Sequence, residues 1–182
     1  AARQSRKSLV VMVGCSAEVS GSRLKEEACA DLVLDQTAKE NLAGIILQHL
    51  GMPAPALPDI SIPRFSTKRA LLKVQDGCDF FCAYCIVPRA RGTPVSRPLA
   101  DIIAEAEQLA AAGYREIVLT GANLGLFGDG TRRLPALLET LENVKGIERI
   151  RLSSIEPSTV ERDIIAHMAQ SHKLCHSLHV PL

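Results

Sequence analysis

Three cysteines indicate the clearest chemistry in this sequence: Cys78, Cys82 and Cys85 form a C-x3-C-x2-C triplet within eight residues. Gly77 precedes them and Pro88 follows, so we predict a loop that wraps a bound group, not a continuous helix or strand. Thiolates select zinc, cuprous copper or iron–sulfur clusters. Structural zinc usually takes four protein ligands, and this loop has no fourth cysteine. Three thiolates around a four-iron cluster would leave one iron open, and the spacing differs from the ferredoxin patterns.

The elements that must position this loop alternate between strand and helix. The predicted strands are residues 70–74, 116–120, 148–153 and 174–180, and the predicted helices have apolar faces within 99–110, 134–141 and 160–168. Such alternation predicts a parallel sheet with right-handed crossovers. Four strands cannot close a barrel. We therefore predict an α/β fold, a partial (β/α) barrel that is incomplete at its C-terminus, while a small open α/β sheet would have the same local structure.

Polar motifs follow the first three predicted strands, where reactive groups gather in parallel barrels. The cysteine loop follows the first strand, the Gly-rich segment 120–125 follows the second, and segment 154–157 follows the third. Glycines let a ligand approach the backbone closely, although glycines after a strand often serve only the turn. Glu156 could accept a hydrogen bond from a ribose hydroxyl or a substrate, or be an exposed surface carboxylate.

Residues 1–50 predict part of a separate small α/β domain. The apolar run 9–13 predicts a buried parallel strand that ends beside Cys15, which by itself reads as a small buried thiol. The other expected elements are a helix at 22–30, a strand at 31–34 and a helix at 37–50. Cys29 of the first helix is expected in the core of the domain, and Thr37 and Glu40 are expected to form a capping box at the start of the second. Four prolines in 51–67 predict an extended linker, and residues 68–182 form the partial barrel.

The cysteine triplet, with Tyr84 directly before its last member, resembles the radical S-adenosylmethionine (SAM) enzymes. The wider stretch 70–125, with LLKVQDGCDFFCAYCIVPRARG and EIVLTGANLG, resembles the methylthiotransferases that modify tRNA. Residues 151–157, RLSSIEP, are similar to the branch of that family that acts on N6-threonylcarbamoyladenosine.

This resemblance implies two clusters. A [4Fe-4S] cluster on Cys78, Cys82 and Cys85 would bind SAM, and Cys15 would be one ligand of a second, auxiliary [4Fe-4S] cluster whose other ligands lie outside this sequence. The remaining residues that the resemblance implies in cofactor binding are Tyr84, Gly121, Ala122, Asn123 and Glu156.

The implied reaction replaces the hydrogen at C2 of a tRNA adenosine next to the anticodon with a methylthio group. An electron from the cluster would split SAM into methionine and a 5′-deoxyadenosyl radical that takes the substrate hydrogen; the auxiliary cluster would supply sulfur and a second SAM the methyl group. The implied partners are tRNA and an electron donor such as a flavodoxin or ferredoxin. Two alternatives stay open: another radical SAM enzyme, acting on isopentenyladenosine or a ribosomal protein, and a non-catalytic iron–sulfur or zinc-binding module.

Composition limits the other function classes. The 182 residues are 47% hydrophobic and 23% charged with a net charge of +1, so any RNA contact must come from a local patch and not from a global basic field. Arg89, Arg91 and Arg97 could bind a SAM carboxylate or RNA phosphates, or form a solvated loop. Histidines 167, 172, 176 and 179 lack the spacing of a metal site.

The clustered cysteines predict a reducing cytoplasm, and no apolar run has transmembrane length. Because the chain does not begin with Met, we expect an internal piece of a longer protein.

Overall fold

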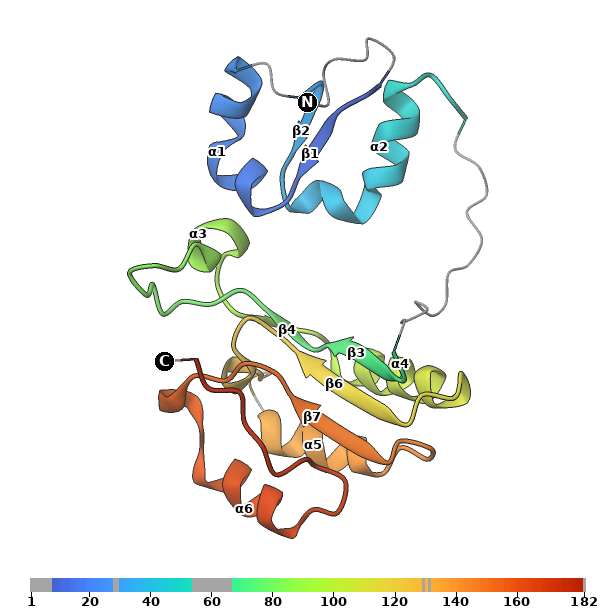
Figure 1. Cartoon of the computed structure of the whole chain (residues 1–182), viewed down its shortest axis with the longest axis vertical. Helices are drawn as coiled ribbons and strands as arrows, with labels where there is room; N and C mark the ends of the chain where they lie inside the picture. Colours follow the sequence, from blue (N-terminus) through green and yellow to red (C-terminus); the bar gives the residue numbers. More distant parts are fainter. Residues whose placement is uncertain (1–7, 28–29, 54–66, 129, 131, 182) are drawn as a thin grey trace. The chain divides into compact units, whose positions relative to one another are not determined.

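The computed structural model describes residues 8–27, 30–53, 67–128, 130 and 132–181. The chain divides into two compact units (Figure 1): Ala1–Ile60 with Phe80–Gly92, and Ser61–Asp79 with Thr93–Leu182. The predicted boundaries at 1–50, 51–67 and 68–182 stay a prediction, and most of the expected Pro-rich linker lies outside the described residues.

The first unit has a two-stranded parallel sheet with Met12 opposite Val33. Helices α1 and α2 flank this strand pair (Figure 1). The elements of this unit are β1 (Val11–Val13), α1 (Cys15–Glu26), β2 (Leu32–Leu34), the 3₁₀ helix η2 (Thr37–Asn41), α2 (Leu42–His49) and α3 (Val87–Arg91).

Three expectations for this unit were wrong. Strand β1 is half-buried to exposed, not buried. Helix α1 begins at Cys15, not at residue 22, because Gly14 takes the left-handed φ of 114° that turns the chain out of β1 and Ala17 packs into the unit. Thr37 lies inside η2 and does not cap it; Asp35 accepts the hydrogen bond from the Ala38 amide instead, at 2.9 Å. Cys29 lies outside the described residues.

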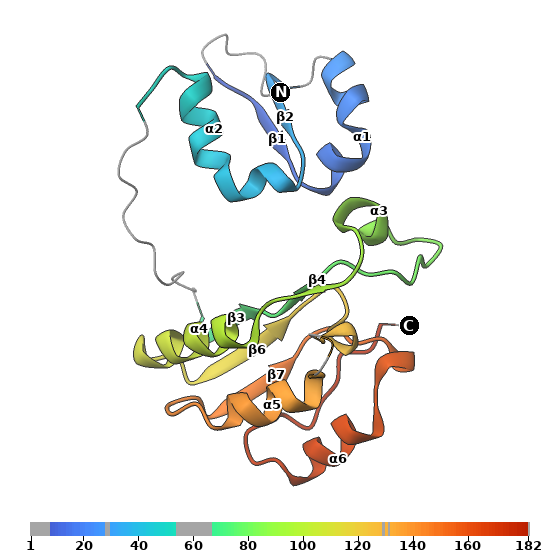
Figure 2. The ribbon, with the colours of Figure 1, turned by 180° about the vertical axis from the view of Figure 1, so that it is seen from behind.

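The second unit is built on a three-stranded parallel sheet in the order β3-β6-β7, made of β3 (Arg69–Lys73), β6 (Glu116–Thr120) and β7 (Arg149–Leu152). Ala70, Ile117 and Ile150 lie opposite one another and are fully buried. Helices α4 (Leu99–Ala111) and α5 (Leu134–Glu142) lie on the same side of the sheet (Figure 2) and bury their apolar faces in this core. The α/β class and the parallel sheet are therefore confirmed.

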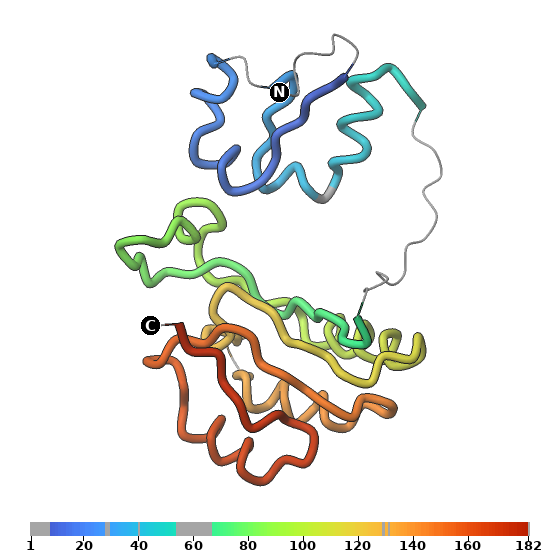
Figure 3. Tube along the Cα trace, viewed as in Figure 1, coloured from blue at the N-terminus to red at the C-terminus, as the bar shows by residue number. Residues whose placement is uncertain are grey.

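The predicted fourth strand is wrong as a continuous element. Residues 174–180 run beside β7 (dark red in Figure 3) but form only two isolated parallel bridges, Ile150 to Leu174 and Ser154 to His179. Between them the Ser177 amide donates to the carbonyl of Cys175 at 2.8 Å, a tight local turn that interrupts the ladder. Over the described residues the sheet is open, and no closed barrel is formed.

The last helix, α6 (Arg162–Gln170), was predicted to begin at Val160 but begins two residues later. Val160 directly follows the 3₁₀ helix η4 (Pro157–Thr159). Ile165 is 48% exposed and does not belong to the apolar face that buries Ile164 and Met168. No helix in the described part of the chain is long and apolar enough to cross a membrane.

A short antiparallel ribbon that the sequence patterns did not predict closes the base of the cysteine loop. It pairs β4 (Gln75–Asp76) with β5 (Val95–Ser96), with Gln75 opposite Ser96. The Arg97 amide extends the pairing to the carbonyl of Val74 at 2.9 Å. The loop therefore leaves the sheet and returns to it at one fixed point.

Candidate cofactor site

Three loops begin at the carboxyl edge of the parallel sheet, as predicted. They are the cysteine loop after β3 and β4, the Gly-rich segment after β6, which contains the 3₁₀ helix η3 (Leu124–Leu126), and the segment that leads from β7 into η4. Gly77 starts the cysteine loop with a left-handed φ of 72° and is buried, so a side chain at this position would be strained.

The three cysteines are free and half-buried. Cys78 belongs to the segment Ser61–Asp79 of the second unit, whereas Cys82 and Cys85 belong to Phe80–Gly92 of the first. The Cys85 amide donates to the carbonyl of Cys82 at 2.9 Å, and such a turn keeps the two Cα atoms within about 7 Å. The loop between the first two cysteines holds Phe81, whose φ of 50° is unusual for a residue with a side chain.

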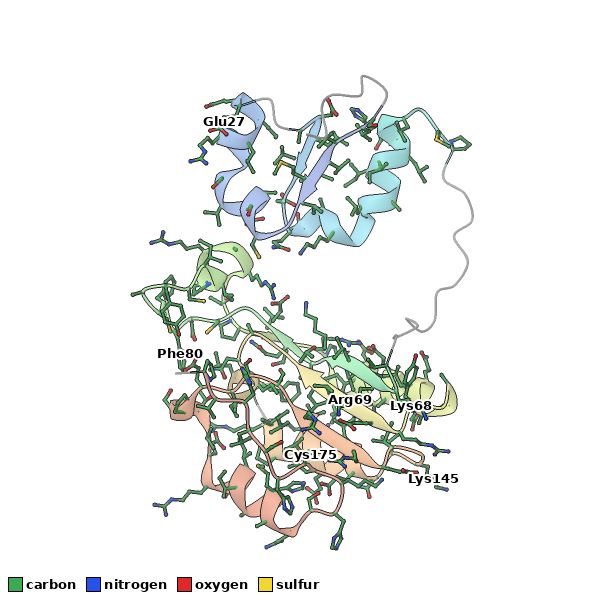
Figure 4. The ribbon with its side chains drawn as sticks, in the orientation of Figure 1. Glu27, Lys68, Arg69, Phe80, Lys145 and Cys175 are labelled. Carbon is green, nitrogen blue, oxygen red and sulfur yellow. The ribbon has the colours of Figure 1, made fainter. Side chains whose placement is uncertain are left out.

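Within the described part of the chain, no group of three or more His, Cys, Asp or Glu side chains is arranged to hold a metal ion. Convergence of the three thiols therefore stays a prediction. Their chemistry nevertheless fits an iron–sulfur cluster, because all three are unpaired, partly accessible and carried by one loop. Aromatic side chains line this loop at the surface: Tyr84 is 81% exposed, and Phe80 is labelled in Figure 4.

Asn123, in the Gly-rich segment, is buried with 1% of its surface exposed. Its Oδ1 accepts hydrogen bonds from the amides of Gly125 at 3.1 Å and Glu156 at 3.2 Å, and from the Thr159 hydroxyl at 3.2 Å. Among the described residues its Nδ2 has no partner, and neither does the buried Oγ of Ser153. A buried donor without an acceptor is costly, so the Nδ2 fits a site that receives an acceptor from a bound group.

Gln75 is a residue of this site that the sequence did not reveal. Its side chain is fully buried, and its Nε2 donates to the carbonyls of Asp76 at 2.8 Å and Gly77 at 2.7 Å. Its Oε1 accepts from the Asn123 amide at 3.1 Å. A Cβ added at Gly121 would lie 2.7 Å from this Oε1, so the close approach of the two segments requires glycine. The available signal was a polar residue that directly follows the predicted strand 70–74.

The other predicted contacts are less buried. Ala122 is half-buried beside Asn123. Glu156 is half-buried at the N-cap of η4, where its amide faces Asn123. Neither position tests the predicted contact with SAM.

Cys15 lies at the N-terminus of α1 in the first unit. Its Sγ accepts a hydrogen bond from Nε2 of Gln36 at 3.5 Å, and the thiol is half-buried. Its role as a ligand of a second cluster stays a prediction.

Arg97 forms two hydrogen bonds within the second unit. Its Nη1 donates to the Glu105 carboxylate and to the carbonyl of Lys73, both at 2.7 Å. Its proposed contact with an anionic ligand stays one of two open interpretations. Arg89 and Arg91 lie on the short helix α3 and are exposed. His167 pairs with Glu142 at 3.0 Å, in keeping with a structural role.

A comparison with known families identifies the class. The radical SAM superfamily matches residues 72–182, which include the end of β3, the cysteine loop, β6 and β7. The chain belongs to the radical SAM superfamily.

Individual relatives are methylthiotransferases by name. The chain is 37% identical over 182 residues to a threonylcarbamoyladenosine tRNA methylthiotransferase MtaB of Chlamydia pneumoniae, covering 99% of this chain and 42% of the relative. The MtaB of Bacillus subtilis is 34% identical, with 100% and 44% covered. A tRNA-2-methylthio-N(6)-dimethylallyladenosine synthase of Thermodesulfovibrio yellowstonii is 32% identical, with 95% and 42% covered. The chain thus spans less than half the length of these relatives.

Proposed function

We propose that this chain is part of a radical SAM enzyme that transfers a methylthio group to an adenosine of tRNA. The observation that carries the proposal is the cysteine triplet on a loop at the carboxyl edge of the β3-β6-β7 sheet, in a chain that belongs to the radical SAM superfamily. The similarity of nearly the whole chain to tRNA methylthiotransferases supports the choice of reaction.

Each part of the site has a proposed task. Cys78, Cys82 and Cys85 hold a [4Fe-4S] cluster, which when bound supplies the electron for reductive cleavage of SAM. The Gly121–Asn123 backbone and the side chains of Tyr84 and Glu156 orient SAM against that loop. Cys15 contributes one ligand to a second cluster.

The preferred substrate is N6-threonylcarbamoyladenosine in tRNA. The Chlamydia and Bacillus relatives that carry this name support it. A relative named for dimethylallyladenosine at similar coverage makes that nucleoside the second candidate. Digestion of tRNA after reaction, followed by mass spectrometry of its nucleosides, separates the two, because the methylthio group would appear on only one of them.

The first test is replacement of each loop cysteine by alanine in the reconstituted full-length protein, with 5′-deoxyadenosine formation as the measurement. Each variant should lose SAM cleavage, because the cluster loses a thiolate that nothing in the loop replaces. The matched control is Cys175→Ala: this thiol is buried and hydrogen-bonded to Arg149, outside the loop, and its loss should leave cleavage intact. Normal cleavage by a loop variant with its iron intact would rule out the assignment.

The proposed partners are tRNA and a flavodoxin or ferredoxin as electron donor, in the cytoplasm. A non-catalytic iron–sulfur or zinc module is the competing function. It predicts no change in the electronic spectrum of the metal centre when SAM is added, whereas binding of SAM to an open iron changes that spectrum.

A further inference from the structure

The buried side chains of Gln75 and Asn123 connect all three loops at the carboxyl edge of the sheet. Gln75 binds the base of the cysteine loop through the carbonyls of Asp76 and Gly77, and binds the Gly-rich segment through the Asn123 amide. Asn123 then binds the segment after β7 through the amide of Glu156 and the hydroxyl of Thr159. These hydrogen bonds form one continuous network, which we call the Gln75–Asn123 relay.

We propose that Gln75 is a positioning residue: through the relay it holds the start of the cysteine loop at a fixed place relative to the Gly121–Asn123 backbone. This inference rests on the proposed binding of SAM by that backbone and by a cluster on the cysteine loop. It goes further by assigning the alignment of the two halves of the site to one side chain that touches neither the cluster ligands nor, by our proposal, SAM.

Three observations argue for positioning over simple filling of the core. Gln75 and Asn123 are the buried polar side chains of the described residues, and both lie in the relay. Gln75 uses both its donor hydrogens and its acceptor, so its amide is held in one orientation. An apolar residue of the same size would fill the space but leave two carbonyls and one amide without these partners, each an unsatisfied buried group.

The relay also ends on the residue before the first cysteine. Gly77 has no side chain that could anchor it in the core. The position of Cys78 therefore depends on the Gly77 backbone, whose carbonyl Gln75 holds by a hydrogen bond. A misplacement of about 1 Å between reacting groups can cost roughly a hundredfold in rate. A shift of the loop base should therefore weaken the use of SAM without preventing assembly of the cluster.

The test uses the reconstituted full-length protein without tRNA and compares Gln75→Met, Gln75→Glu and the parent. Iron per chain, the KM for SAM, the rate of 5′-deoxyadenosine formation and the SAM-induced change in the electron paramagnetic resonance of the reduced cluster are measured. We expect parental iron content, a KM for SAM raised about tenfold or more, and a diminished SAM-induced spectral change. Gln75→Glu should resemble Gln75→Met, because a carboxylate cannot donate to the two carbonyls.

A pair of threonines provides a matched control. Thr159→Val removes a hydroxyl of the relay whose single hydrogen is shared between the Glu156 carbonyl at 2.8 Å and Asn123 Oδ1 at 3.2 Å, whereas Thr140→Val removes one that donates to the Ala136 carbonyl at 2.8 Å within α5. The substitution is the same and both side chains are partly buried. Thr159→Val should raise the KM for SAM several-fold, and Thr140→Val should leave it unchanged.

Parental SAM kinetics in the Gln75 variants would overturn the proposal, as would equal effects of the two threonine substitutions. If Gln75→Met does not fold, the threonine pair decides, and parental kinetics in Thr159→Val then overturn it. A parent protein that cleaves SAM but modifies no tRNA would refute the proposed function while leaving this test intact. A parent that neither binds nor cleaves SAM would refute both.

Discussion

Glu116, on the central strand β6, is the carboxylate on which three arginines of the two neighbouring strands converge, on the sheet face opposite α4 and α5. Its oxygens lie 3.1 Å from Arg69, 3.1 Å from Arg151 and 3.9 Å from Arg149 (Arg69 is labelled in Figure 4). The pKa of Arg149 is raised, first by its hydrogen bond to Cys175 and then by charge attraction, including that of Glu116. One half-buried carboxylate thus offsets the mutual repulsion of three cations.

Glu116→Ala should therefore lower the free energy of unfolding by about 1–2 kcal/mol, because the three arginines would still lie close together and repel one another without the carboxylate that offsets their charge. The matched control is Glu148→Ala, since that carboxylate is 68% exposed and 3.9 Å from Arg115; its removal should cost at most about 0.5 kcal/mol. Urea unfolding at low and high salt measures both. Equal effects of the two substitutions would contradict the special role of Glu116.

Cys15 offers a second test at the residue scale. In the reconstituted full-length protein, Cys15→Ala should leave SAM cleavage largely intact but stop formation of the methylthio nucleoside, because only the auxiliary cluster loses a ligand. Cleavage is measured as 5′-deoxyadenosine and sulfur insertion by nucleoside mass spectrometry. Parental methylthiolation in this variant would make Cys15 merely structural.

At the scale of the element, Asp35 shows how a side chain starts the η2–α2 helical segment. Its Oδ1 accepts from the Thr37 hydroxyl at 2.7 Å and from the Ala38 amide at 2.9 Å. Both bonds favour the charged carboxylate and lower its pKa below the ordinary value of 3.8, the Thr37 bond most strongly. Because the folded pKa is lowered, the stabilisation is present above the unfolded pKa and is lost as the pH falls through the folded pKa.

Thr37→Ala should consequently raise the pKa of Asp35 toward its ordinary value, whereas Thr37→Ser, which keeps the hydroxyl, should leave it low. An NMR titration of the Asp35 carboxyl between neutral pH and pH ~2 measures this. An unchanged pKa in Thr37→Ala would show that the hydroxyl is not a significant partner in solution.

At the scale of the whole molecule, the two units differ in how they are stabilised. The buried apolar residues described in the first unit are small: Ala17, Ala30, Ala90 and Pro88. The core of the second unit consists mainly of large aliphatic side chains from β3, β6, β7, α4 and α5. Because buried apolar area is the main stabilising term, the first unit should open at a lower free energy.

Hydrogen exchange can check this difference directly. The amides of β1 and β2 should exchange at least about tenfold faster than those of β6, the central strand of its sheet. Mass spectrometry of peptides that cover residues 11–13, 32–34 and 116–120 gives the rates. Similar protection of all three strands would show that the chain unfolds as one cooperative body.

Apolar periodicity alone determined most of the second unit. The pattern at 116–120 predicted β6 to the residue, and the leucines at 134, 137, 138 and 141 predicted the buried face of α5. These segments are predictable because burial of one face is a local property that recurs at the period of the element. The triplet of cysteines was equally visible, since its spacing lies within one loop.

Only the tertiary structure decided how the site is held. Gln75 looks like a polar residue at the end of a strand, and its role appears only when Gly77 and Asn123 are both seen within hydrogen-bonding distance, the latter 48 residues away in sequence. The apolar residues of segment 174–180 likewise read as a strand, but the turn in which the Ser177 amide donates to the Cys175 carbonyl interrupts its pairing with β7. Composition and period report which side chains must be buried, whereas hydrogen bonds between distant segments depend on distances that exist only in the folded chain.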